Sequence, residues 1–264
     1  MPNRASILKQ QFLQSIALPW EGLLPESKVQ ELLANENVRY YSSVYTPIVT
    51  LWAMISQVLD PDKSLSQAVK RMGIWLSAAG AVPPSSDTGA YSKARGRLPS
   101  RLVEQLVPFV AEELEKQVPT EQQWCGRRVR VLDGTTVLMS DTAENQAEYP
   151  QHSNQKPGCG FPIAKMVVLF SLVTGAVVSA GIASLASSEI VMSRLIYANL
   201  APDDVILADQ AYGNYVDLVL VKERGADAVF RKNHLSKTDF RRGKKLGIGD
   251  RKVVWNKPQQ CPNI

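Results

Sequence analysis

Two aspartates each stand directly after an apolar run that is typical of a buried strand. Asp133 follows residues 129–132, and Asp209 follows residues 205–208. If both runs are central strands, the two carboxylates lie at one edge of the sheet or beside each other. Ionised carboxylates repel unless a cation lies between them, and their oxygens are ligands that Mg²⁺ prefers. The pattern therefore predicts a Mg²⁺ site, with Mn²⁺ as the alternative ion, of the kind that acts on phosphodiesters.

The residues after each aspartate bear on this interpretation. An aspartate after a strand is also a common turn former or helix cap, so neither residue is decisive alone. Asp133 precedes Gly-Thr-Thr, small polar residues that let a backbone approach a phosphate. Tyr212 follows Asp209 closely, and its ring is suited either to stacking on a base or to packing in the core. Both interpretations of Tyr212 stay open.

The first part of the chain predicts helices. Apolar residues recur every three or four positions between residues 6 and 117, interrupted by prolines that include Pro47, Pro61, Pro83, Pro84 and Pro99. The Pro-Pro-Ser-Ser-Asp-Thr-Gly segment at 83–89 predicts a loop, and residues 90–97 predict a short basic helix before a helix that opens at Pro99. We therefore expect an N-terminal helical domain over residues 1–120.

From Arg127 onward the pattern changes to alternating strands and helices. Strands are expected at 127–133, 165–173, 176–183, 205–209 and 226–231, and helices at 187–199 and 215–223. This β-β-β-α-β-α-β order matches a ribonuclease H-like domain. The expected fold class is α/β: a mixed sheet core over residues 121–231, incomplete and preceded by the helical domain, with a basic region at 232–264.

Positive charge is concentrated at the C-terminal end. The net charge is +5, but residues 222–264 hold twelve Lys or Arg against four Asp or Glu, which leaves the first 221 residues at −3. Such a block attracts a polyanion, so nucleic acid is the leading class of partner, and a solvated basic face is the alternative. The residues expected to contact phosphate are Arg231, Lys232, Lys237, Arg241, Arg242, Lys244 and Lys245, with His234 among them.

Composition and cysteine usage exclude several classes of protein. Hydrophobic residues make up 45% and charged residues 21%, which is typical of a globular domain. Neither a cleavable leader nor a membrane span is evident, so a cytoplasmic location without a membrane partner is expected. Cys125, Cys159 and Cys261 are odd in number and far apart, which indicates free thiols.

Two smaller features need a separate interpretation. His152 and Cys159 do not have the paired spacing of a zinc site, so residues 152–161 are interpreted as a mobile loop in which Lys156 faces DNA. Lys93, Arg95 and Arg97 form a second basic cluster, for which contact with nucleic acid and simple solvation are both open.

Several spaced segments resemble the DDE transposases grouped with bacterial insertion sequence four. They are DGTTVLMSDT at 133–142 with Asn145 and Tyr149, VILADQAYGNY at 205–215, DFRRGKKLG at 239–247, and upstream Thr46-Pro47 and TGAYSKARGRLP at 88–99. The resemblance implies that Asp133 and Asp209 are metal ligands. It also implies that the basic region begins a β-rich insertion and that the helical domain over residues 1–120 binds DNA ends. For the cluster of Lys93, Arg95 and Arg97, contact with transposon ends and simple solvation both stay open.

The same resemblance implies a third acidic residue, in a Y-x2-R-x3-E-x6-K motif beyond that insertion. The 264 residues contain no such motif, so the chain is expected to be truncated before it. Neither of two candidate replacements is expected to serve. Glu223 lies two turns along a helix that leaves the Asp209 edge, and Glu189 starts a helix whose dipole favours a carboxylate.

Three hypotheses follow. The first is a cut-and-paste transposase that hydrolyses and transfers strands of double-stranded DNA at transposon ends and target, weakly active or inactive alone, with a homodimer partner left open. The second is a catalytically dead DNA-binding or dimerising remnant that inhibits the intact enzyme. The third is a ribonuclease H-like nuclease unrelated to transposition, which would cut without preference for inverted repeats.

Overall fold

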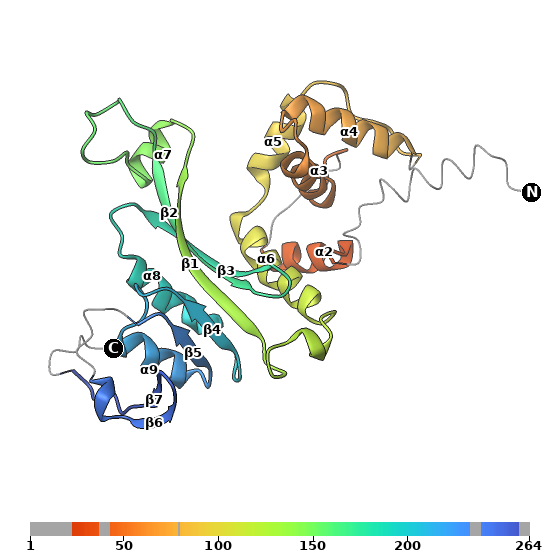
Figure 1. The fold of residues 1–264 in the computed structure, drawn as a ribbon. Helices are drawn as coiled ribbons and strands as arrows, with labels where there is room; N and C mark the ends of the chain where they lie inside the picture. Colours follow the sequence, from red (N-terminus) through yellow and green to blue (C-terminus); the bar gives the residue numbers. More distant parts are fainter. Residues whose placement is uncertain (1–22, 37–42, 79, 233–238, 259–264) are drawn as a thin grey trace, which may run out of the picture. The chain divides into compact units, whose positions relative to one another are not determined.

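A computed structural model describes residues 23–36, 43–78, 80–232 and 239–258 of the chain (Figure 1). The chain divides into two compact units, residues 1–110 and 111–264. Each unit has its own cluster of buried apolar side chains.

The described residues of the first unit form helices and no strand. The helices are α2 (Glu26–Asn35), α3 (Pro47–Leu59), α4 (Leu65–Ala78), α5 (Gly89–Arg97) and α6 (Ser100–Glu115), the last of which continues into the second unit. Thr46 caps α3 by accepting the Val49 N–H, with Pro47 in the first turn. The predicted loop at 83–89 and the short basic helix after it are confirmed to within one residue.

The second unit is mixed α/β. Its five-stranded sheet has the order β3-β2-β1-β4-β5, in which β1 is antiparallel to β2 and parallel to β4. The strands are β1 (Val129–Leu138), β2 (Ile163–Ser171), β3 (Val177–Ser184), β4 (Val205–Ala208) and β5 (Asp227–Phe230). The hairpin predicted around Thr174-Gly175 is confirmed as β2–β3, and Gly175 has the positive φ of 70° that its turn needs.

The first strand is longer than the sequence pattern predicts. The apolar run predicts an end at Asp133, but β1 continues through Asp133 to Leu138 because β2 pairs with it over that whole length. By contrast, β4 ends at Ala208, the partner of Leu132. Asp133 therefore lies within β1, on a stretch that pairs with β2 on one side and has no strand partner among the described residues on the β4 side.

Helices pack on this sheet and complete its core. Helix α8 (Glu189–Ile196) contacts β2 and β3, and α9 (Tyr215–Glu223) contacts β5. The predicted bounds of α9 are confirmed, whereas the expected helix at 187–199 is α8 followed by the 3-10 turn Tyr197–Asn199. The short α7 (Ala143–Glu148) was not predicted; Thr142 caps it by accepting the Asn145 N–H.

A separate two-stranded antiparallel sheet lies in the basic region. It consists of β6 (Lys244–Gly247) and β7 (Asp250–Lys252) and follows a 3-10 turn at Phe240–Arg242. A further 3-10 turn, Thr120–Gln122, precedes β1. Gly249 joins the strands with a positive φ of 74°. Neither strand has an apolar alternation, so the pattern did not predict them individually.

Across the residues that the structure describes, none of the helices combines the length and the apolar character that crossing a membrane requires.

Candidate functional site

Strand pairing brings Asp133 and Asp209 to adjacent positions. Leu132 on β1 is the parallel partner of Ala208 on β4, and each aspartate is the next residue along its chain. Both side chains are exposed. The juxtaposition predicted from the two apolar runs is thus present in the sheet.

Each carboxylate is fixed by a backbone N–H from its own segment. Asp133 Oδ1 accepts the Gly134 N–H at 2.9 Å, and Asp209 Oδ1 accepts the Ala211 N–H at 2.7 Å. Within the described part of the chain, no other hydrogen bond and no ion pair involves either carboxylate. The second oxygen of each aspartate is therefore without a hydrogen bond or ion pair from that part of the chain.

Tyr212 packs in the core, so the prediction that it stacks on a base is not met in this structure. Its side chain is 1% exposed, and its hydroxyl donates a hydrogen bond to Glu189 Oε1. Burial raises the pKa of Tyr212, and the bond to Glu189 and the charges of Glu189, Asp133 and Asp209 raise it further. Three carboxylates therefore act electrostatically on one buried hydroxyl.

Glu189 lies closer to this region than the sequence suggested. It is in the first turn of α8, as the dipole argument predicts, but its carboxylate also occupies the space beside Gly134, where a Cβ would overlap it. In this structure Gly134 thus accommodates a carboxylate rather than a phosphate. Lys165 supports the start of the helix by donating to the Ser187 carbonyl at 2.6 Å. Only tertiary packing reveals these contacts.

The described residues contain no group of three or more Asp, Glu, His or Cys side chains arranged to hold one metal ion. Glu189 is turned toward Tyr212 and Gly134. The site geometry therefore consists of two exposed aspartates supported by a third carboxylate.

Arg231 lies at the same edge of the sheet. Its N–H donates to the Ala208 carbonyl at 3.3 Å, and its own carbonyl would be 2.8 Å from a Cβ on Gly213. Its side chain is exposed. A cation expected to contact phosphate is therefore next to the turn that carries Asp209.

The remaining predicted cations are exposed or partly exposed where the structure describes them. Asp239 pairs with Arg241 at 3.0 Å and with Arg242 at 3.6 Å, and the hydrogen bonds from Arg241 lower the pKa of this carboxyl group. Lys244 and Lys245 are on β6, and Lys232 is exposed at the end of β5. Lys237, His234 and Cys261 lie outside the described residues.

The β6–β7 hairpin places like charges directly opposite one another. Lys244 is the cross-strand partner of Lys252, and Lys245 is the partner of Arg251. Like charges in such positions destabilise a pair of strands. The hairpin therefore holds four cationic side chains in two opposed pairs.

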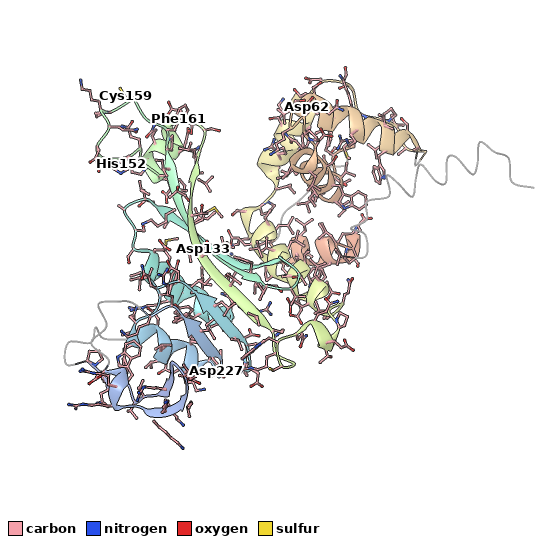
Figure 2. The ribbon with its side chains drawn as sticks, viewed as in Figure 1. Asp62, Asp133, His152, Cys159, Phe161 and Asp227 are labelled. Atoms are coloured by element: carbon pink, nitrogen blue, oxygen red, sulfur yellow. The ribbon has the colours of Figure 1, made fainter. Side chains whose placement is uncertain are left out.

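The loop predicted at 152–161 has no regular structure, and one glutamine organises it. Gln151 Oε1 accepts the N–H groups of Gly158 and Gly160, while its Nε2 donates to the carbonyls of Gln155 and Lys156. Lys156 is exposed. Figure 2 shows His152 and Cys159 at one end of the β1–β2 ribbon and Asp133 partway along it. Leu138, the last residue of β1, lies five positions beyond Asp133, or about 17 Å along the strand.

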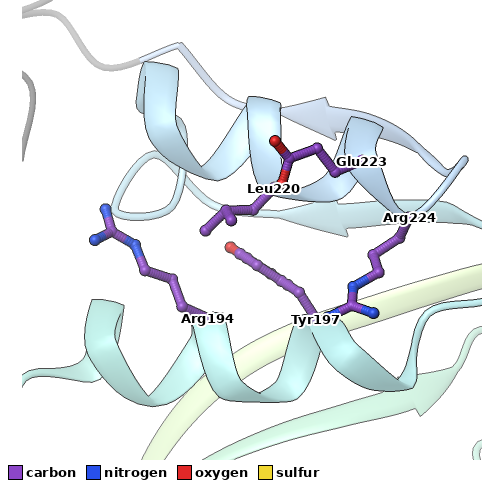
Figure 3. A pocket seen from close by; sticks show the side chains of 5 residues that line it. All are labelled: Arg194, Tyr197, Leu220, Glu223 and Arg224. Atoms are coloured by element: carbon purple, nitrogen blue, oxygen red, sulfur yellow. The ribbon is translucent and has the colours of Figure 1, made fainter. Parts of the chain in front are cut away.

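Glu223 is remote from the aspartates, as predicted. It lies at the end of α9 and lines a cavity of about 270 Å³ with Arg194, Tyr197, Leu220 and Arg224 (Figure 3). In the first unit, Arg95 lies over the Tyr91 ring at 5.7 Å, while Lys93 and Arg97 are exposed.

Comparison with known proteins agrees with the resemblance noted in the sequence. No model of a known protein family matches the chain. The chain is similar to "Transposase InsG for insertion sequence element IS4" of Escherichia coli (strain K12), with 26% identity over 162 residues. That match covers 61% of this chain and 36% of the relative, so the chain spans about a third of the relative's length. The chain is therefore related to the transposases of the insertion-sequence-four family.

Proposed function

We propose that this chain is the part of a cut-and-paste DNA transposase that carries the first two acidic residues of its metal-dependent site. The observation that carries the proposal is the parallel pairing of Leu132 with Ala208, which puts Asp133 and Asp209 side by side. The similarity to a transposase supports the choice of this reaction class over other phosphodiester chemistry.

The sheet supports a ribonuclease H-like core. Its order β3-β2-β1-β4-β5, with three antiparallel strands continuing into a parallel pair, agrees with the β-β-β-α-β-α-β order expected of that fold. In such a core, residues at the ends of adjacent parallel strands meet at one edge, where a substrate backbone has access.

The residues fit a hard divalent cation, Mg²⁺ or Mn²⁺. Asp133 and Asp209 supply only oxygen, each has one oxygen without a hydrogen bond or ion pair from the described residues, and Mg²⁺ is commonly held by one or two carboxylates together with substrate phosphates. A bound ion would supply activation of the attacking oxygen and stabilisation of the leaving oxygen. Backbone N–H groups hold both aspartates in place for this purpose.

The basic surface supports DNA as the partner. Arg231 is positioned beside the Asp209 turn, and the β6–β7 hairpin concentrates four cations in two opposed pairs. These residues are suited to phosphate contacts, which fix the orientation of a duplex without reading its sequence. Strand cleavage and transfer at transposon ends, and the target DNA, follow from the family and belong to this proposal.

The experiment is a nicking assay with the full chain. Negatively supercoiled plasmid that carries the DNA flanking the coding sequence is incubated with Mg²⁺ or Mn²⁺, and nicked circles are measured for the unsubstituted chain and for Asp133→Ala. We expect metal-dependent nicking that Asp133→Ala abolishes, with cuts at the inverted repeats. Cutting without preference for those repeats would favour an unrelated nuclease.

A second function is favoured by one specific observation: the described residues hold no group of three metal-binding side chains. A chain with two acidic ligands would then bind DNA without cleaving it and occupy transposon ends against an intact enzyme. Retained DNA binding with no nicking, in both metals, is the result that selects this alternative.

A further inference from the structure

Glu189 contacts both segments that carry the proposed metal ligands. Its Oε1 accepts the Tyr212 hydroxyl hydrogen bond, and its carboxylate fills the space that a Cβ on Gly134 would occupy. Gly134 directly follows Asp133, and Tyr212 lies three residues after Asp209. A single side chain therefore connects β1 to the turn after β4.

In both segments, the residue that contacts Glu189 lies within three residues of an aspartate. The Gly134 N–H is bonded to Asp133 Oδ1, so a movement of Gly134 moves the donor that holds this carboxylate. The turn that begins at Asp209 is closed by the Ala211 N–H, and the next residue is the buried Tyr212. Loss of either contact of Glu189 therefore changes the position of an aspartate carboxylate.

Glu189 is itself firmly held. It is in the first turn of α8, where the helix dipole favours a negative charge. Lys165 ties the preceding Ser187 carbonyl to β2, and Met192 and Ile196 of the same helix are buried in the core. The carboxylate thus extends from a fixed helix end and does not depend on a loop.

We infer that Glu189 is a positioning residue that holds Asp133 and Asp209 in register for a divalent cation, through Gly134 and Tyr212. This inference rests on the proposed function and assigns Glu189 a part in the same site. Consecutive strand residues point to opposite faces, so a carboxylate beside Gly134 lies across the pleat from the Asp133 side chain. That geometry favours support of the ligands over direct coordination.

The test is the affinity of the full chain for Mn²⁺, measured by the loss of the free-ion electron paramagnetic resonance signal. Glu189→Ala, Tyr212→Phe and Gly134→Ala each disturb the contact differently, and each should weaken Mn²⁺ binding about tenfold or more, as is usual when the support of a ligand is removed. Glu189→Gln keeps an oxygen that accepts the Tyr212 hydroxyl, and it should bind Mn²⁺ nearly as the unsubstituted chain does.

Two controls separate this role from general damage to the core. Tyr197→Phe removes the hydroxyl of an equally buried tyrosine in the same core and should leave Mn²⁺ affinity unchanged. The double variant Glu189→Ala/Tyr212→Phe should bind no more weakly than Glu189→Ala alone, because Glu189→Ala already removes the contact that Tyr212→Phe disrupts. If Glu189→Ala fails to fold, Tyr212→Phe and Glu189→Gln carry the comparison.

Different results overturn different claims. Equal loss of Mn²⁺ affinity in Glu189→Gln and Glu189→Ala would make Glu189 a direct ligand and refute the positioning role. Unchanged affinity in Glu189→Ala and Tyr212→Phe, with binding abolished in Asp133→Asn, would refute the inference alone. Absence of Mn²⁺ binding by the folded, unsubstituted chain would refute the proposed metal site, and the inference with it.

Discussion

Leu132 of β1 and Ala208 of β4 are partners in a parallel ladder, and an aspartate follows each of them. Because β2 extends β1 beyond this point while β4 stops, Asp133 is held in a strand and Asp209 in a turn. The two proposed ligands thus lie on different kinds of backbone. A metal ion bound between them would join a carboxylate on a strand to a carboxylate on a turn.

Asp133→Asn should abolish metal-dependent stabilisation without lowering stability in the absence of metal. Removing one of two neighbouring negative charges relieves repulsion in the metal-free protein, whereas an ion that binds only the folded state adds about 2.7 kcal/mol at a concentration a hundred times its Kd. Thermal unfolding with and without Mn²⁺ measures both effects. Asp250→Asn, which alters an exposed carboxylate on β7, should respond to Mn²⁺ as the unsubstituted chain does.

Loss of Glu115 should destabilise the second unit strongly. Arg130 Nη1 lies 3.2 Å from Glu115 Oε1, and the two side chains are 4% and 7% exposed. Glu115→Ala removes a negative charge that offsets the buried Arg130 guanidinium, and such a loss typically lowers the free energy of unfolding by about 3–5 kcal/mol. Urea denaturation gives the value.

The matched control for Glu115 is Glu113→Ala, because Glu113 pairs with Lys116 at the surface and should contribute no more than about 1 kcal/mol. Replacing both partners, as Glu115→Leu/Arg130→Met, should recover much of the loss. If Glu115→Ala and Glu113→Ala lowered the free energy of unfolding equally, the importance assigned to the buried Glu115–Arg130 pair would be contradicted.

Asp227 should contribute stability that acid removes. Hydrogen bonds from Lys222, at 2.8 Å, and Arg127, at 2.9 Å, lower the pKa of Asp227 below its ordinary value. A lowered folded-state pKa stabilises the fold above the unfolded-state pKa of about 3.9, and this contribution disappears as pH falls through the folded-state value.

The stability difference between the unsubstituted chain and Asp227→Asn should therefore be largest above about pH 5 and decrease as pH falls through the lowered folded-state pKa of Asp227. Chemical denaturation across this range measures it. A difference that grows on acidification would show that the sign is wrong. Glu121→Gln, at an exposed 3-10 turn, is the comparison for loss of one surface carboxylate.

Lys245→Glu should have opposite effects on the β6–β7 hairpin and on DNA binding. It converts the Lys245–Arg251 cross-strand pair into an attractive one, which stabilises the strands by a few tenths of a kcal/mol to about 1 kcal/mol. It also removes a cation expected to contact phosphate, so affinity for duplex DNA should fall and the salt dependence of binding should become shallower by about one unit.

Fluorescence anisotropy over a range of salt concentrations tests the second effect. Lys116→Glu makes the same change in net charge on another surface of the second unit and should alter DNA affinity far less. Equal effects of the two substitutions would mean that net charge, rather than the hairpin, determines binding.

The sequence by itself determined the local elements and the identity of the two aspartates. Short apolar runs located β4 and, on either side of the Thr174-Gly175 turn, the β2–β3 hairpin, because buried strands are built from apolar side chains. The spaced motifs around Asp133 and Asp209 indicated the transposase relationship, because residue identity and spacing alone carry that signal.

Tertiary structure decided what the patterns left open. Pairing with β2 extended β1 through Asp133, since a strand continues wherever a neighbour satisfies its backbone, whatever its own apolar pattern. Burial of Tyr212 is accompanied by a hydrogen bond to Glu189, twenty-three residues earlier, which no local pattern encodes. The hairpin β6–β7 has no apolar alternation and shows its opposed charges only once its register is known. Contacts between residues distant in sequence depend on the packed arrangement of the elements, and that arrangement set the surroundings of both aspartates.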